Sequence, residues 1–193
     1  MKKYLLLFSV GIVFVIVGFK IEPINFGEKS FLAQVHKWSD SLRLIPVEPQ
    51  ETDFKSEEFN GRFYYLKQKQ STRGYAYLGR VNGCEAGGCE IPKPGENKVF
   101  EYFDYYAIYD SVGAVSAIDI FNYKATHGKE VCERDWLDQF LGYNGRRNLK
   151  VGVTVDAISG ATTSTENFSL DLQEATRTIR ALIVRNSKAD SIK

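Results

Sequence analysis

The sequence has little of what marks several familiar classes of protein. Among its 193 residues are three cysteines, two histidines and five prolines. The histidines, His36 and His127, are far apart in sequence, and there is neither a paired C-x-x-C zinc motif nor a C-x-x-C-H haem signature. The G-x-G-x-x-G fingerprint and the G-x-x-x-x-G-K-[ST] phosphate loop are also absent. The sequence therefore gives no reason to expect a metal site, a c-type haem or a common nucleotide-binding loop.

The charges are balanced, with 25 basic and 24 acidic residues and a formal net charge of +1. No basic block or aromatic-basic repeat is present, so nucleic acid is not an expected partner. The chain is 44% hydrophobic and 13% aromatic, which is enough to bury a core. We therefore expect one folded domain.

The N-terminus has the pattern of a membrane-targeting segment. Met1, Lys2 and Lys3 precede sixteen uncharged residues, 4–19, and no small-x-small cleavage site follows them. This favours an uncleaved signal anchor or transmembrane helix over a removed signal peptide. Lysines at the extreme N-terminus favour keeping that end in the cytoplasm, so the rest of the chain is expected on the extracytoplasmic side.

Three regions follow from these patterns: an anchor over 1–21, a tether and amphipathic helix over 22–50, and a folded domain over 51–193. In the second region, apolar residues at helical spacing predict a helix capped by Ser30 and ending before Pro46. His36 lies on this helix and has no pattern of a ligand.

The period then changes to that of strands. Residues 62–68 and 75–81 predict a hairpin joined by 69–74, and residues 99–110 and 114–123 predict a longer one. A helix is expected over 132–142 with Trp136, Leu137, Phe140 and Leu141 on one face, and a strand over 150–155. Apolar spacing from Phe168 to Ile183 predicts a final amphipathic helix. The expected fold class is α+β, an antiparallel sheet packed against helices.

The segment 153–168, VTVDAISGATTSTENF, raises the main functional question. Residues 163–166 fit a capping box, so the final helix is expected to begin within a residue or two of Thr163. Free N–H groups and the helix dipole favour an anion at such an end. Gly160 and Ala161 have little side-chain bulk, and Thr162 adds a hydroxyl. Together these features indicate a phosphate site with an attachment point, although capping alone also explains Ser and Thr residues there.

The string Asp156-x-x-Ser159-Gly160-Ala161-Thr162 resembles the signature of the FMN-binding domain in the flavin subunits of Rnf and sodium-pumping NADH:quinone reductase complexes. In that family a flavin transferase joins FMN, taken from FAD, to the motif threonine through a phosphoester. The resemblance covers roughly residues 100–184, whereas residues 64–94 match nothing in the family. It implies covalent FMN on Thr162 and a domain held outside the cytoplasm by one N-terminal helix.

The resemblance also implies a set of cofactor-binding residues and no catalytic residue. Asp156 either orients the backbone or assists the transferase, or is simply a turn residue. A second loop, 123–131, lies against the flavin in the family; His127 there is either a flavin contact or an exposed loop histidine. The expected cofactor-binding residues are Thr162, Ser159, Gly160, Ala161, Thr163, Asp156, Thr126, His127 and Gly128.

Cys84 and Cys89 form C-x-x-x-x-C in a glycine-rich loop. Outside the cytoplasm a disulfide between them would persist and staple the loop. The alternative is a redox-active pair that exchanges electrons with the flavin, although four intervening residues exceed the spacing of reactive C-x-x-C motifs. Cys132 is then expected to be unpaired and buried on the helix of Trp136.

Three functional hypotheses remain open. The first is an electron-transfer module whose FMN relays electrons between membrane or extracytoplasmic redox partners, matured by a flavin transferase. The second is a small extracytoplasmic flavin reductase. The third is a thiol-disulfide or assembly protein that uses Cys84 and Cys89, in which the SGAT turn only caps a helix.

Overall fold

The computed structural model describes residues 23–47, 60–85, 100–125 and 127–190. Its centre is a five-stranded antiparallel sheet whose strands neighbour one another in chain order. The strands are β1 (Arg43–Pro46), β2 (Gly61–Gln68), β3 (Ser71–Glu85), β4 (Phe100–Asp110) and β5 (Val115–Phe121). Both predicted hairpins are confirmed, and the expected α+β class with an antiparallel sheet is correct. The proposed anchor over 1–21 lies outside the described residues.

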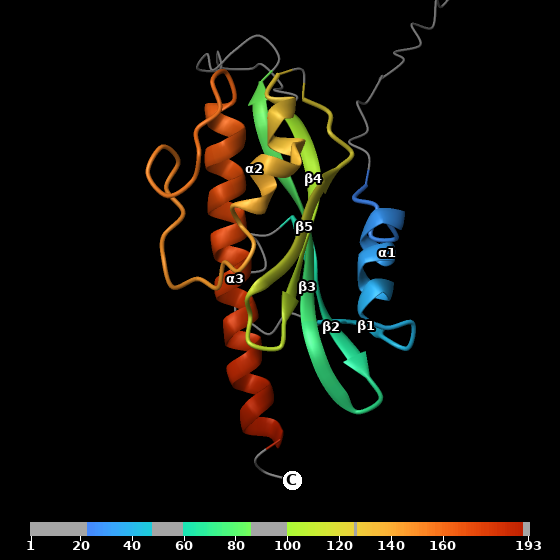
Figure 1. Cartoon of the computed structure of the whole chain (residues 1–193). Helices are drawn as coiled ribbons and strands as arrows, with labels where there is room; N and C mark the ends of the chain where they lie inside the picture. Colours follow the sequence, from blue (N-terminus) through green and yellow to red (C-terminus); the bar gives the residue numbers. More distant parts are fainter. Residues whose placement is uncertain (1–22, 48–59, 86–99, 126, 191–193) are drawn as a thin grey trace, which may run out of the picture.

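Helices cover both faces of the sheet (Figure 1). On one face lies α1 (Lys29–Trp38), which buries Phe31 and Val35. On the other face lie α2 (Arg134–Asp138) and the long α3 (Thr162–Asp190). The short 3-10 helix η2 (Lys129–Cys132) precedes α2. The domain therefore has three layers, helix, sheet and helix. Separately, no helix in the described ranges is long and apolar enough to cross a membrane.

Strand alternation explains why the sheet has a core on each side. Successive side chains of a strand point to opposite faces. On β3, Tyr75 and Tyr77 belong to the core beneath α3, whereas Ala76 and Leu78 belong to the core beneath α1. A central strand that is apolar on both faces needs a helix on each, which is what α1 and α3 supply.

The final helix agrees closely with its predicted pattern. It begins at Thr162, one residue before Thr163, and its predicted apolar positions from Phe168 to Leu182 are fully buried. Because the helix begins at Thr162, Thr163 lies inside the first turn and is not the cap that the capping box predicted. Further along, the hydroxyl of the buried Thr176 donates to Leu172 O at 2.7 Å, so this one polar group is satisfied within the helix.

Three local predictions are wrong. The cap of α1 is Glu28, whose carboxylate accepts the Ser30 N–H at 3.3 Å, and not Ser30. The Trp136 helix spans only five residues, and Leu141, expected on its buried face, is 43% exposed. The strand expected over 150–155 is a turn with one isolated bridge between Val151 and Val155.

The turns are tighter than the sequence suggested. The first hairpin turns at Lys69 and Gln70, not over 69–74, with Lys69 at a φ of +54°. In the second, the Asp110 carboxylate accepts the N–H groups of Val112 and Ala114 at 3.0 and 2.9 Å. The short strand β1 was not predicted; it places Pro46 on an edge of the sheet, where a missing N–H is tolerated.

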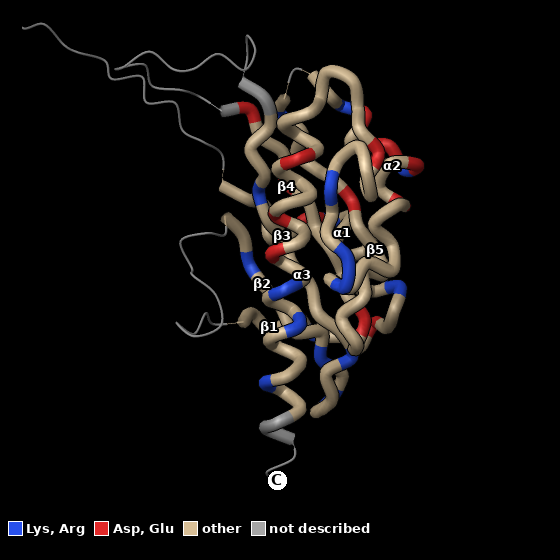
Figure 2. Tube along the Cα trace, turned by 90° about the vertical axis from the view of Figure 1, so that its left-hand side faces the viewer, with Lys and Arg blue, Asp and Glu red and all other residues tan. Residues whose placement is uncertain are grey.

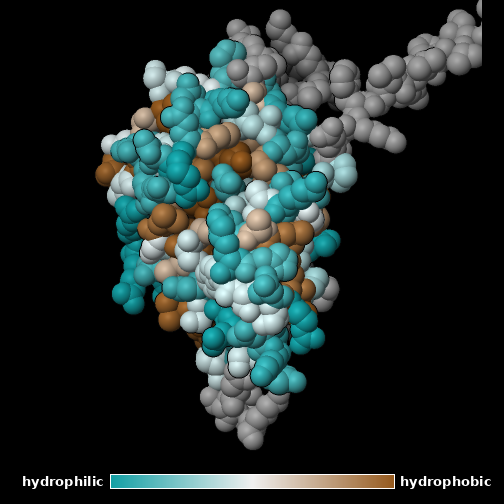
Figure 3. Space-filling view, turned by 45° about the vertical axis from the view of Figure 1, so that its right-hand side comes forward, coloured by the Kyte–Doolittle hydropathy of each residue, from teal (hydrophilic) through white to brown (hydrophobic). Residues whose placement is uncertain are grey.

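The surface mixes polar and apolar residues. Hydrophilic residues cover most of the face in Figure 3, with apolar side chains in small groups between them. Basic residues lie on α1, β1 and β2 in Figure 2. A functional site must therefore be sought in particular arrangements of side chains.

Candidate functional site

The segment before α3 is a tight turn. The Ala161 N–H donates to Ile158 O at 3.1 Å, and Gly160 between them has a φ of +78°. An added Cβ at Gly160 would meet nothing within 4 Å, so the glycine serves the backbone conformation and leaves open space beside the turn. Ser159 and Gly160 are both exposed.

The four hydroxyl residues that open α3 differ sharply in exposure. Thr162 is exposed, Thr163 is half-buried, and Ser164 and Thr165 are fully buried. The Thr165 hydroxyl donates to the carbonyl oxygens of Ala161 and Thr162, at 3.1 and 2.9 Å. Thr162 is therefore the most exposed of the four hydroxyl residues that open α3. It stands where the first N–H groups of a helix lack intrahelical acceptors and favour an anion.

The second predicted loop lies directly against this turn. Gly128 has a φ of +81°, and a Cβ added there would lie 2.5 Å from the Cβ of Ala161. Ala161 is fully buried in this contact, so its small size serves packing rather than the approach of a ligand. The Tyr123 hydroxyl donates to His127 O, which fixes the loop, while the His127 residue is exposed. The structure thus brings Gly128 to the motif.

Thr126 lies outside the described residues, and nothing places the His127 side chain against Thr162. The end of strand β3 is a third participant that the sequence did not suggest. A Cβ added at Gly83 would lie 3.3 Å from Ser164 Oγ and 3.4 Å from Ala125 Cβ. This strand end, the loop after β5 and the first turn of α3 therefore meet closely. In the sequence, the one sign of this contact is Gly83 itself, because a residue without a side chain permits a close approach.

Asp156 is held through its backbone. The indole N–H of Trp136 donates to Asp156 O at 2.9 Å, and the Asp156 N–H donates to Gln139 Oε1 at 2.8 Å. The carboxylate of Asp156 makes no hydrogen bond or ion pair within the described part of the chain, and the residue is exposed. Trp136 and Gln139 are therefore positioning residues that the sequence did not reveal. The one available signal was that a buried tryptophan N–H needs an acceptor.

An aromatic cluster fixes the next turn of the helix. The ring of Phe168 lies 4.8 Å from Tyr105, 5.1 Å from Phe140 and 5.4 Å from Trp136, measured between ring centroids. Such tilted and edge-on pairs add stabilisation beyond the area that they bury. Because the cluster joins α3 to α2 and β4, the start of α3 has a firm support.

A half-buried acid, Asp171, lies further along the same helix. The Tyr105 hydroxyl donates to Asp171 Oδ2 at 2.8 Å. Burial raises the pKa of Asp171 to about 6, against the opposing effect of hydrogen bonds from Tyr105 and Tyr77. Asp171 lines a cavity of about 400 Å³ between β3 and α3, where the Asn167 amide donates to Asn82 O at 2.9 Å. No sequence motif indicated this group.

A buried ion pair joins strands β3 and β4 nearby. The Arg80 guanidinium donates to both carboxylate oxygens of Asp104, at 2.6 and 2.9 Å, and the Asn122 amide donates to Asp104 Oδ2 at 2.8 Å. Arg80 also stacks over the Tyr102 ring at 3.8 Å. With its partners this close, Asp104 is a structural carboxylate.

The structure tests only part of what the sequence predicted for the three cysteines. Cys84 belongs to β3, but its side chain and all of Cys89 lie outside the described residues, so their proposed disulfide stays a prediction. Cys132 is a free, half-buried thiol at the end of η2, two residues before α2, so its predicted place, buried on the Trp136 helix, is wrong. Burial raises its pKa to about 11, so the thiol stays protonated near neutrality. No cluster of three or more metal-ligating residues occurs among the described residues.

Comparisons with known proteins give no family: no family model matches the sequence, and no curated protein matches it significantly.

Proposed function

We propose that the protein is a membrane-anchored flavoprotein with its domain outside the cytoplasm, which carries FMN in phosphoester linkage on Thr162 and relays electrons between redox partners. The observation that carries this proposal is the exposure of Thr162. Thr162 is the most exposed of the hydroxyl residues that open α3, and the backbone of this helix turn is fixed by packing against Gly128 and Gly83. An incoming transferase needs such an accessible oxygen on a positioned backbone.

The residues present fit a phosphate at this place. The first turn of α3 offers N–H groups to an anion, and there is open space beside Gly160, two residues before Thr162. In the attachment step, Thr162 Oγ1 forms a bond to the FMN phosphorus of FAD, the pyrophosphate bond breaks, and AMP leaves. The hydroxyl proton passes to a base of the transferase or to water. Ser159 and Thr163 are close enough in sequence to assist in holding the phosphate.

Each remaining residue has a limited role in this proposal. Gly128 shapes the wall behind Ala161, and His127 lies on the exposed side of the same loop. The Asp156 carboxylate is exposed and is free to face a transferase, while Trp136 and Gln139 hold its backbone. Bound FMN would supply uptake of two electrons and their release one at a time. A covalent link would prevent its loss where no cytoplasmic pool replaces it.

The test is intact mass of the full-length chain, produced in a host that exports it and carries an active flavin transferase. We expect wild type to gain the mass of one FMN less one water, with colour that survives denaturation. Thr162→Ala should lose both, and Thr162→Ser should retain a modifiable hydroxyl. Ser159→Ala is the comparison variant: it removes an exposed hydroxyl three residues away that would help to hold the phosphate, so it should slow the modification without abolishing it, because the attachment oxygen of Thr162 is still present.

Three outcomes would each contradict part of the proposal. If folded wild type remains colourless beside an active transferase, the flavin carrier is wrong and Cys84 and Cys89 become the residues to study. If Ser159→Ala abolishes the modification while Thr162→Ala retains it, the attachment residue is wrong. If purified flavinylated protein instead turns over steadily with a small-molecule donor and acceptor, the protein is a reductase rather than a relay.

A further inference from the structure

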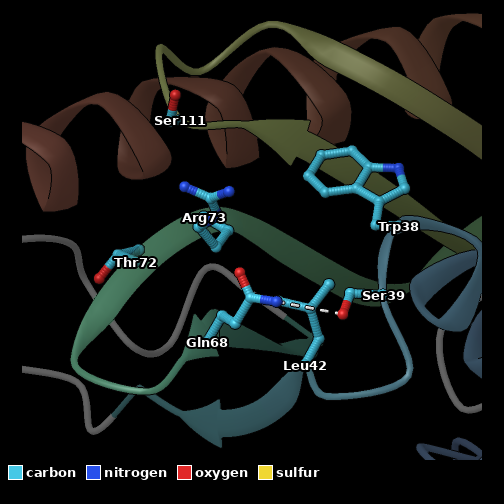
Figure 4. A pocket seen from close by; sticks show the side chains of 7 residues that line it. All are labelled: Trp38, Ser39, Leu42, Gln68, Thr72, Arg73 and Ser111. Atoms are coloured by element: carbon cyan, nitrogen blue, oxygen red, sulfur yellow. Dashed lines mark hydrogen bonds between the residues drawn. The ribbon is translucent and has the colours of Figure 1, made fainter.

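A second cavity opens at the hairpin end of the sheet, between α1, β2, β3 and the turn after β4. Its volume is about 540 Å³. Figure 4 shows the side chains of Trp38, Arg73, Gln68, Thr72, Ser39 and Ser111 around it. These residues combine one large aromatic ring, one cation and several hydrogen-bonding groups. No part of the flavin proposal uses them.

Trp38 provides a planar apolar wall. It is 38% exposed, whereas the other tryptophan, Trp136, is 7% exposed. A Cβ added at Gly74 of β3 would lie 2.9 Å from Cζ3 of Trp38, so the glycine allows the edge of the indole to pack against the strand. Figure 4 shows the six-membered ring directed toward Arg73. The exposed part of the ring is thus available to stack on a flat ligand.

Arg73 provides an unused charge. Within the described part of the chain, its guanidinium makes no ion pair or hydrogen bond, although the residue lines the cavity. The acid nearest in register, Asp110, pairs with Gly74 and uses Oδ1 to bind its own turn. Arg80 on the same strand is the contrast, because Asp104 engages its guanidinium with two hydrogen bonds. A free guanidinium fork matches a carboxylate in two-point geometry.

The other walls are polar and ordered. The Gln68 amide nitrogen donates to Ser39 Oγ at 3.2 Å and to Ser41 Oγ at 2.9 Å, which fixes one side of the cavity. The hydroxyls of Thr72 and Ser111 lie on the Arg73 side in Figure 4. Basic residues on the neighbouring strands β1 and β2 add positive charge to this end of the molecule (Figure 2). The surroundings therefore favour an anion over a cation.

From these features we propose that the cavity binds a small aromatic carboxylate, with its ring on Trp38 and its carboxylate on Arg73. The volume accommodates one or two fused rings. The stacking wall selects for a planar ligand, and the guanidinium selects for a carboxylate over a neutral amide. This site is independent of the proposed function, since it shares no residue with the turn before α3.

The test is isothermal titration calorimetry on the full-length chain in mild detergent, with 2-naphthoate as the probe. We expect saturable binding of one probe per chain. Arg73→Gln should weaken it about tenfold or more, because the two-point contact is lost. Arg43→Gln is the matched control: it removes a nearby exposed arginine that does not line the cavity, so it should weaken binding by less than about twofold, through the loss of one screened positive charge. Probe that enters micelles contributes equally to all three titrations.

Two further probes test each half of the recognition on wild type alone. The neutral isostere 2-naphthamide should bind about tenfold more weakly or worse, and cyclohexanecarboxylate should lose the stacking contribution. The proposal is overturned if 2-naphthoate gives no saturable heat, if 2-naphthamide binds equally well, or if folded Arg73→Gln binds like wild type. The amide comparison decides the matter even if Arg73→Gln does not fold.

Discussion

Replacing Asp171 with asparagine should change how stability depends on pH. The asparagine side chain has nearly the same shape, and its amide oxygen still accepts the Tyr105 hydroxyl that lies 2.8 Å from Asp171 Oδ2. What the substitution removes is a titrating group whose pKa is raised from 3.8 to about 6, chiefly by burial. The effect of that one ionisation on folding is therefore isolated.

The magnitude follows from the two pKa values. A difference of about two pKa units corresponds to about 3 kcal/mol between the charged and neutral forms. Because Asp171 keeps partial contact with solvent, which screens its charge, we expect about 1–2 kcal/mol. The native state binds the proton more tightly than the unfolded state, so this contribution is full below about pH 3.8. It is lost as the pH rises through about 6.

The assay is urea unfolding of the full-length chain in mild detergent, followed by far-ultraviolet circular dichroism between pH 4 and 8. Wild type should gain about 1–2 kcal/mol relative to Asp171→Asn as the pH falls from 8 to 4. Most of the change should occur between pH 6 and 4, and every other titrating group cancels in the difference. A difference that stays flat, or that grows as the pH rises, would refute the assignment of a raised pKa to Asp171.

Two other substitutions test the support of α3 by the same unfolding measurement. Gly128→Ala combines a positive φ with a Cβ 2.5 Å from that of Ala161, so it should cost about 2–4 kcal/mol. Gly142→Ala, with a similar φ and open space around it, should cost about 1 kcal/mol; equal losses would contradict the contact. Phe168→Ala removes the centre of the aromatic cluster and should cost about 3–5 kcal/mol, whereas Leu170→Ala, at a residue that is 57% exposed, should change stability by less than about 1 kcal/mol. A small loss for Phe168→Ala would mean that the cluster does not hold the helix.

The elements that could be predicted from the sequence are those in which apolar residues repeat with a clear local period. Strands β2 to β5 are rich in aromatic and branched residues and end at clear turns, and α3 repeats apolar residues over several turns. Residues 150–155 have valines at alternating positions, which is the pattern of a strand. There, Gly152 has a φ of +75° and Thr154 Oγ1 receives the Lys150 N–H at 2.8 Å. A side chain that bonds its own backbone competes with strand pairing, which the alternation alone does not reveal.

The same distinction explains what was predictable in the candidate site. The residues from Ser159 to Thr163 are contiguous, so a motif and a helix start were visible together. The supports come from elsewhere in the chain: Gly83 approaches Ser164, and Trp136 bonds Asp156 O. Contacts between residues so far apart in sequence leave no periodic signal. Asp171 was missed for a related reason, because its raised pKa arises from burial by a helix and a sheet that meet only in the folded chain.

The two proposed sites lie toward opposite ends of strand β3. Gly74 packs against Trp38 at one end, and Gly83 packs near Ser164 at the other. Nine residues of strand separate them by about 30 Å, so a ligand on Arg73 would not touch a group on Thr162. Flavinylation of Arg73→Gln should therefore match wild type, and Thr162→Ala should bind 2-naphthoate as wild type does. If either substitution abolished both properties, loss of the common fold would be the cause, since β3 is the central element that both sites share.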